Sequence, residues 1–157
     1  MTTFQTPLRA GTVKDGATTL NSGTTGLTGA PNGCNLGSAQ LIQQGTISFK
    51  AATLVNDLTF FLPPNSTIQN IWIDTLTAYD SATSAGLTVG TASAGTQYQS
   101  SVDVKTTGRE TQSFTAAQLL AMSNIGSNTS VIATVTSVGQ PTTGTVFVQI
   151  AYSAPLI

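Results

Sequence analysis

The amino-acid sequence predicts an all-β protein: an antiparallel β-sandwich or jelly roll with one short helix and an extended N-terminal arm. Seven or eight short runs of apolar and β-branched residues follow one another, separated by Gly, Pro, Asn and Ser. Neither a G-x-G-x-x-G nor a P-loop motif lies between a strand and a helix, and no internal repeat is visible. Nucleotide-binding α/β folds, propellers and solenoids are therefore excluded. A chain of 157 residues has room for one ordinary domain.

Residues 1–37 differ from the rest because Gly recurs among Thr, Asn and Ser, and large apolar residues occur only singly. So few apolar anchors cannot offset the conformational entropy that such a stretch loses on folding alone. We interpret it as an extended arm that becomes ordered on a neighbouring molecule; a disordered tail is the alternative. A linker would not need spaced apolar residues, and those we expect to make the contact are Phe4, Leu8, Val13, Leu20 and Leu27.

The β-sandwich domain is expected to span residues 38–157. Its first strands are predicted at 40–50, where Ile47 and Phe49 share a face, and at 57–62, where alternate apolar residues also share a face. Pro63 and Pro64 then impose a turn. The longest strand is predicted at 67–79. Because it is apolar on both faces near Ile71, Trp72 and Ile73, we expect a central strand or one covered by a second surface, with Trp72 in the core.

Strands at 86–90 and 98–104 follow, and then the one helix. Residues 115–122 are good helix formers, with Ser113 or Thr115 as the N-cap and Gly126 beyond the end. Two strands with regular alternation end the domain. In the first, Val131, Ala133 and Val135 alternate with Ile132, Thr134 and Thr136. In the second, Val146, Val148, Ile150 and Tyr152 alternate with Thr145, Phe147, Gln149 and Ala151.

The charge content excludes several functions. Only 7% of residues are charged and the net charge is −1, so no basic face is available for nucleic acid. No apolar stretch is long enough for a membrane helix, and residues 1–10 lack the apolar region of a signal peptide. With Cys34 alone, no internal disulfide can form. We expect synthesis in a reducing cytosol.

Catalytic and metal-binding residue types are scarce. The sequence contains no histidine, the commonest general base and metal ligand, and Cys34 has no base to activate it. Paired carboxylates could in principle hydrolyse glycosides, but the acids lie near predicted strand ends or turns, where solvated acids are common. We therefore expect no enzyme activity, no cofactor, no metal and no small-molecule substrate.

Residues 105–110 (KTTGRE) form the only local charge cluster. A solvated turn accounts for it. The functional alternative is a contact with an acidic neighbour in an assembly, made by Lys105, Arg109 and Glu110.

Three segments carry a family resemblance: FFLPPNSTIQNIWI at 60–73, AYDS at 78–81 and LTVGT at 87–91. Together they resemble the small jelly-roll decoration (cement) proteins of tailed bacteriophages, over roughly the middle third of the chain. In that family a Leu-Pro turn leads into an Ile-rich strand, an Ala-aromatic-Asn/Asp turn follows, and then an apolar-x-Val-Gly-Thr strand. Here Tyr79-Asp80 replaces the expected Phe-Asn, and the arm has no counterpart.

The resemblance implies a virion protein on the capsid surface, made in the host bacterial cytoplasm. Such proteins often assemble as homotrimers, bind the major capsid protein and bridge capsid subunits against internal DNA pressure. An alternative is a receptor- or glycan-binding domain of a tail fibre, spike or adhesin, for which the sequence offers Tyr79, Tyr98 and Tyr152 at most. A minor tail or head-completion protein is a third possibility with the same expected fold.

Overall fold

A computed structural model describes residues 12–15, 18–21, 38–110, 112–127 and 130–155. These residues belong to two compact units, of which the larger is Gln40–Ala154. The smaller unit contains β1 (Thr12–Asp15) and β2 (Thr18–Asn21), an antiparallel pair with Val13 opposite Leu20. This hairpin lies within the segment for which the sequence predicts an extended arm, and it was not predicted.

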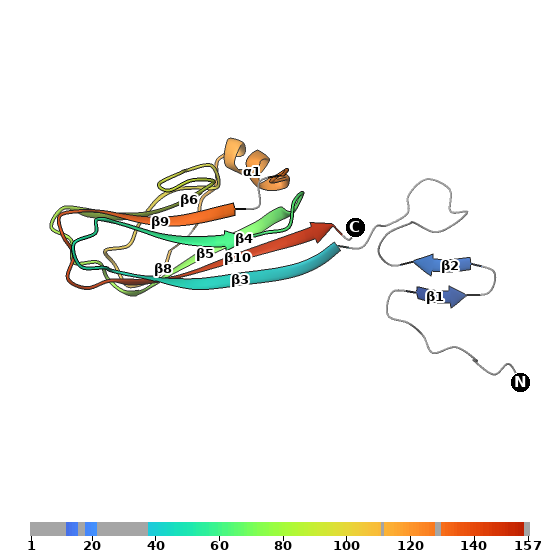
Figure 1. The fold of residues 1–157 in the computed structure, drawn as a ribbon, viewed down its shortest axis with the longest axis horizontal. Helices are drawn as coiled ribbons and strands as arrows, with labels where there is room; N and C mark the ends of the chain where they lie inside the picture. Colours follow the sequence, from blue (N-terminus) through green and yellow to red (C-terminus); the bar gives the residue numbers. More distant parts are fainter. Residues whose placement is uncertain (1–11, 16–17, 22–37, 111, 128–129, 156–157) are drawn as a thin grey trace, which may run out of the picture. The chain divides into compact units, whose positions relative to one another are not determined.

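The larger unit is a β-sandwich of two four-stranded sheets, as the sequence predicts (Figure 1). Its strands are β3 (Ser38–Ser48), β4 (Val55–Phe61), β5 (Thr67–Thr77), β6 (Ser84–Gly90), β7 (Gln99–Asp103), β8 (Gly108–Arg109), β9 (Ser130–Val138) and β10 (Thr145–Pro155). One sheet has the order β3-β10-β5-β8 and the other has the order β4-β9-β6-β7. The two-residue strand β8 was not predicted.

The strand order is that of a jelly roll. Early strands pair with late ones, β3 with β10, β4 with β9, β5 with β8 and β6 with β7, as if one long hairpin had been wound over itself. Two further neighbours, β10 with β5 and β9 with β6, join these pairs into two sheets. The winding packs the two sheets face to face and buries one face of each.

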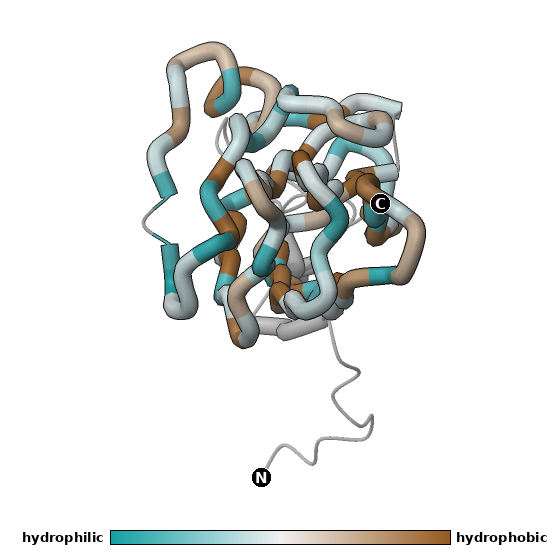
Figure 2. Tube along the Cα trace, turned by 90° about the vertical axis from the view of Figure 1, so that its left-hand side faces the viewer, coloured by the Kyte–Doolittle hydropathy of each residue, from teal (hydrophilic) through white to brown (hydrophobic). Residues whose placement is uncertain are grey.

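The core lies between the sheets and is built from alternating positions. In the last two strands one alternating set is buried, namely Val131, Ala133, Val135, Val146, Val148, Ile150 and Tyr152, and Phe60, Leu62 and Ile47 are buried as well. Figure 2, an end view of the sandwich, shows hydrophobic segments (brown) interspersed with hydrophilic ones (teal) along the trace. The period-2 pattern in the sequence therefore identified the buried faces correctly.

The short helix α1 (Ala116–Ser123) begins with a capping box, since the Thr115 hydroxyl accepts from the Gln118 backbone N–H and the Gln118 side chain accepts from the Thr115 N–H. The prediction of a Thr115 cap is confirmed. The Gln118 side chain is buried and also donates to the hydroxyl of Ser100 on β7 at 2.8 Å. This amide therefore fixes both the start of the helix and its position on the sandwich.

The connection between β9 and β10 is held against the segment that follows β5. Asp80 accepts hydrogen bonds from the Thr142 hydroxyl at 2.5 Å and from the backbone N–H groups of Thr142 and Thr143 at 2.7 and 3.0 Å, which together lower the Asp80 pKa to about 2. The largest contribution to that shift is the hydrogen bond from the Thr142 hydroxyl. Next to it, Gly144 lies against the ring of buried Tyr79.

Candidate interaction surface

Residues 105–110, predicted as a turn, carry the chain from one sheet to the other, because β7 and β8 belong to different sheets. Just before them, Val104 is fully buried; its carbonyl accepts the Tyr79 N–H and its own N–H donates to the Ala85 carbonyl. The Lys105 ammonium donates to the Thr83 carbonyl at 3.3 Å. Lys105 is thus directed toward the start of β6, away from β8, where Arg109 lies.

Arg109 forms a bidentate ion pair with Asp74, its register partner on β5, at 2.7 and 2.8 Å. The hydrogen bond from Arg109 lowers the pKa of Asp74, and the same bond raises the pKa of Arg109. Asp74 therefore neutralises the guanidinium on the outer face of the sheet. Glu110 follows directly and donates its backbone N–H to the Ile73 carbonyl at 3.1 Å.

Trp72 lies on this same outer face, and the prediction that it packs in the core is wrong. Ile71 and Ile73 on β5 are fully buried, whereas Trp72 between them is half-buried. Neighbouring residues of a strand point to opposite faces, so two inward isoleucines place the indole outward. The indole therefore lies outside the core and lines a groove together with Gln112 and Phe114.

A β-bulge in β5 adds polar side chains beside Trp72. Ala151 on β10 is opposite Asn70, but Tyr152 is opposite Ile68, so Gln69 is the extra residue. Both Gln69 and Asn70 are consequently turned away from the core. The Asn70 side chain accepts the Ile71 N–H at 2.8 Å, which holds this amide in place.

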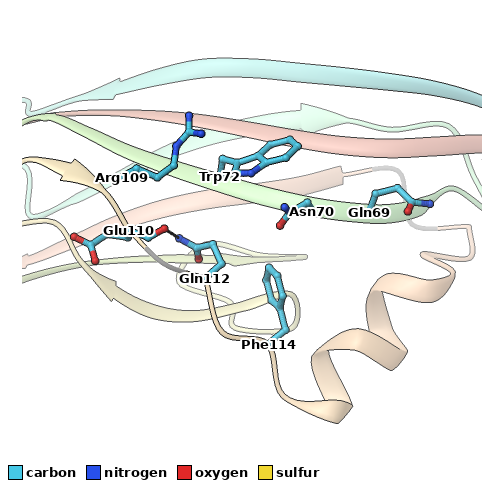
Figure 3. A pocket seen from close by; sticks show the side chains of 7 residues that line it. All are labelled: Gln69, Asn70, Trp72, Arg109, Glu110, Gln112 and Phe114. Carbon is cyan, nitrogen blue, oxygen red and sulfur yellow. Dashed lines mark hydrogen bonds between the residues drawn. The ribbon is translucent and has the colours of Figure 1, made fainter.

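These side chains line a shallow groove of about 700 Å³. Its lining residues, drawn in Figure 3, are Gln69, Asn70, Trp72, Arg109, Glu110, Gln112 and Phe114. A second hollow of about 400 Å³ shares the first three of these and extends to the start of β3, at Leu41 and Ile42. The lining therefore combines side-chain amides, two aromatic rings, the carboxylate of Glu110 and the guanidinium of Arg109, which is paired with Asp74. Such groups are suited to polar and aromatic contacts with a partner.

Large exposed apolar side chains gather at both ends of the sandwich. At one end they lie at the start of β3, the end of β4 and on α1: Leu41, Ile42, Phe61, Leu119 and Leu120. At the other end they are Leu54, Val55, Leu76 and Val138. Single exposed apolar residues are ordinary, but such groups are typical of protein–protein contacts.

The other predicted site residues are distributed as follows. Val13 and Leu20 are register partners on β1 and β2, whereas Phe4, Leu8 and Leu27 lie outside the described residues. Tyr79, Tyr98 and Tyr152 are all buried, so they are not available at a surface site. Burial raises the pKa of Tyr79 to about 12.

No helix among the described residues is long and apolar enough to cross a membrane. Within the same residues, no three His, Cys, Asp or Glu side chains lie close enough together to hold a metal ion.

The strand order defines this chain as a jelly-roll protein, a class that includes viral capsid and lectin domains. Among solved structures, its fold is similar to that of a chain in the cyanophage Pam1 capsid asymmetric unit, with a TM-score of 0.52. The match covers 80% of this chain and 92% of that chain, with 22% sequence identity. No protein-family model matches the sequence, and no curated protein matches it.

Proposed function

We propose that this chain is a structural virion protein that decorates the outer surface of a phage head and stabilises it by bridging capsid subunits. The observation that carries the proposal is the fold similarity to a chain of a cyanophage capsid, which extends over most of both chains. The motifs at 60–73, 78–81 and 87–91, which resemble phage decoration proteins, lie within the jelly roll and support the same function.

In this proposal the protein acts by contact alone, without catalysis. Its apolar groups at the two ends of the sandwich and the groove beside Trp72 supply contact area. A stable contact typically buries about 800 Å² on each partner, and the arm with Val13 and Leu20 would add to the area of the domain. Because few charges are involved, such contacts are less sensitive to salt than exposed ion pairs are. The partner is the major capsid protein, and the resemblance implies a homotrimer.

Immunogold labelling of intact virions tests this function. An antibody against the chain should label the head in many copies. Label confined to the tail or its tip would overturn the proposal.

A binding assay with purified heads tests the arm. The chain lacking residues 1–37 should bind heads much more weakly than the full chain. Fluorescence of Trp72, the only tryptophan, reports in the same samples whether the domain is folded. Unchanged affinity would show that the arm makes no contact with the head.

A second candidate, a receptor- or glycan-binding domain, is favoured by one observation: the half-buried indole of Trp72 beside the amides of Gln69 and Asn70. A planar aromatic face and planar amides are suited to sugar rings and hydroxyls. Titration with neutral oligosaccharides, followed by Trp72 fluorescence, tests it. A saturable change in Trp72 fluorescence, together with loss of glycan pull-down in the Trp72→Ala variant, would support this candidate. No fluorescence change at millimolar sugar would exclude it.

A further inference from the structure

The inference concerns β3, an edge strand of its sheet. In the strand order β3-β10-β5-β8 its one neighbour is β10, so the other edge of this eleven-residue strand is open among the described residues. Open edges expose backbone N–H and C=O groups that can pair with another chain. Native proteins usually protect them with charges, proline or short length. The sequence of β3, SAQLIQQGTIS, has no charge and no proline.

The other three sheet edges are protected. β8 has only two residues, and Arg109 within it is paired with Asp74. β7 carries Asp103, and Gln118 from α1 bonds to its Ser100. β4 carries a charge at its centre, Asp57, and a glutamine side chain of β3 donates to its last carbonyl, that of Phe61, at 2.5 Å. β3 is therefore the one long unprotected edge in the described part of the sandwich.

The side chains of β3 also indicate that something lies alongside it. Leu41 and Ile42 are 45% and 59% exposed, and as consecutive strand residues they point to opposite faces of the sheet. A partner packed on the outer face would reach the hollow that both residues line, but it would leave the backbone groups of the edge unpaired. A strand added at the edge would bring its own side chains to both faces and would cover both.

We propose that β3 pairs antiparallel with β3 of a second copy of this chain, across a twofold axis, so that two four-stranded sheets become one sheet of eight. A twofold contact opposes a surface to itself, so it must be self-complementary. The uncharged β3 meets this requirement, because no like charges oppose each other. Glutamine side chains both donate and accept.

An amide contact on the outer face of the sheet already shows how the pairing would continue. Gln149 on β10 donates to the Gln44 side chain on β3 at 3.2 Å. Gln44 retains its own amide donors, which can reach a glutamine of the second copy and extend this amide row across the new strand pair. The proposal does not depend on the function proposed above: two single chains joined through β3 form a dimer, and two homotrimers joined through β3 form a hexamer. On a capsid, it would supply a joint between two decorating copies.

The experiment is to measure the mass of the full chain in solution by light scattering after size-exclusion chromatography. We expect the unmodified protein to have a mass that is an even multiple of the chain mass, 16.0 kDa. The variant Ile42→Lys should have half that mass, because the two lysines would place like charges close together across the twofold contact. The matched control is Leu76→Lys, since Leu76 is 60% exposed but lies at the end of the central strand β5. A monomer, an odd multiple of the chain mass, or an equal effect of both variants would overturn the proposal.

Hydrogen exchange on the unmodified chain provides a test that needs no variant. Backbone amides of β3 should exchange more slowly at high than at low protein concentration, whereas those of the inner strand β9 should not change. If the exchange of β3 amides does not depend on concentration, the pairing is refuted.

Discussion

Replacing Gly144 with alanine should destabilise the fold by two separable effects. Gly144 has a φ of +148°, a region that side-chain-bearing residues rarely adopt. A Cβ placed on it would lie 2.5 Å from Cγ and 2.5 Å from Cδ2 of the Tyr79 ring. Tyr79 is only 1% exposed, so its ring cannot swing into solvent to make room.

The magnitude follows from adding the two effects. A residue forced into such a backbone conformation costs about 1–3 kcal/mol. Overpacking a closely packed core costs about 1–3 kcal/mol more. Gly144→Ala should therefore lower the free energy of unfolding by about 2–6 kcal/mol, less a small gain of about 0.4–1 kcal/mol because alanine restricts the unfolded chain.

Gly108→Ala is the matched control. Gly108 has a similar φ of +133°, but nothing lies within 4 Å of the position its Cβ would take. Urea unfolding followed by Trp72 fluorescence should give a loss larger for Gly144→Ala than for Gly108→Ala by the packing effect alone, about 1–3 kcal/mol. Equal losses in the two variants would show that the Tyr79 ring does not pack against Gly144, and the reasoning would be refuted.

Three further predictions concern polar groups. The Tyr79 hydroxyl is buried without a hydrogen-bond partner among the described residues. Tyr79→Phe should therefore raise the free energy of unfolding, measured in urea, by up to about 1 kcal/mol. A decrease of similar size in the free energy of unfolding would mean that the hydroxyl is hydrogen-bonded. The Asp80 pKa is lowered to about 2 from 3.8, so its stabilisation is complete above about pH 4 and lost as pH falls through 2. Urea midpoints of the unmodified chain and Asp80→Asn should therefore converge between pH 4 and 2, and a constant difference would contradict this. Asp74→Asn should cost about 0.2–1 kcal/mol, because Arg109 is 58% exposed, and the loss should shrink in high salt; a salt-independent loss would show that the ion pair is not its cause.

The sequence predicted the sandwich well because the core depends on period-2 alternation. Val146, Val148 and Ile150 could be assigned to the buried face from their spacing alone, and all three are fully buried. The capping residue Thr115 was identifiable for a similar local reason, since its cap involves Gln118 three residues along. Both signals lie within one strand or one helical turn.

The features that sequence analysis missed depend on long-range pairing. Trp72 lies between two isoleucines, and alternation shows only that it faces the other way, not whether a second layer covers that face. The alternation therefore predicts correctly that Trp72 lies on the face opposite the two isoleucines, but it does not predict how exposed that face is. The Arg109–Asp74 ion pair joins β8 to β5. In the sequence these strands are separated by β6 and β7, which belong to the other sheet, so no local pattern indicates the pair. Likewise, β8 has only two residues, too few to show any periodicity.

The winding of the strands has a consequence for how the chain folds. β10 comes last among the described strands, yet it lies between β3 and β5, so β3 has no partner in its sheet until β10 is in place. Early structure must therefore form elsewhere, and β6 with β7, close in sequence, is the natural starting point. Folds dominated by pairings between distant segments fold slowly, in milliseconds to seconds. During that interval the uncharged β3 is exposed on both edges, and newly made chains at high concentration are then most at risk of joining one another before they are complete.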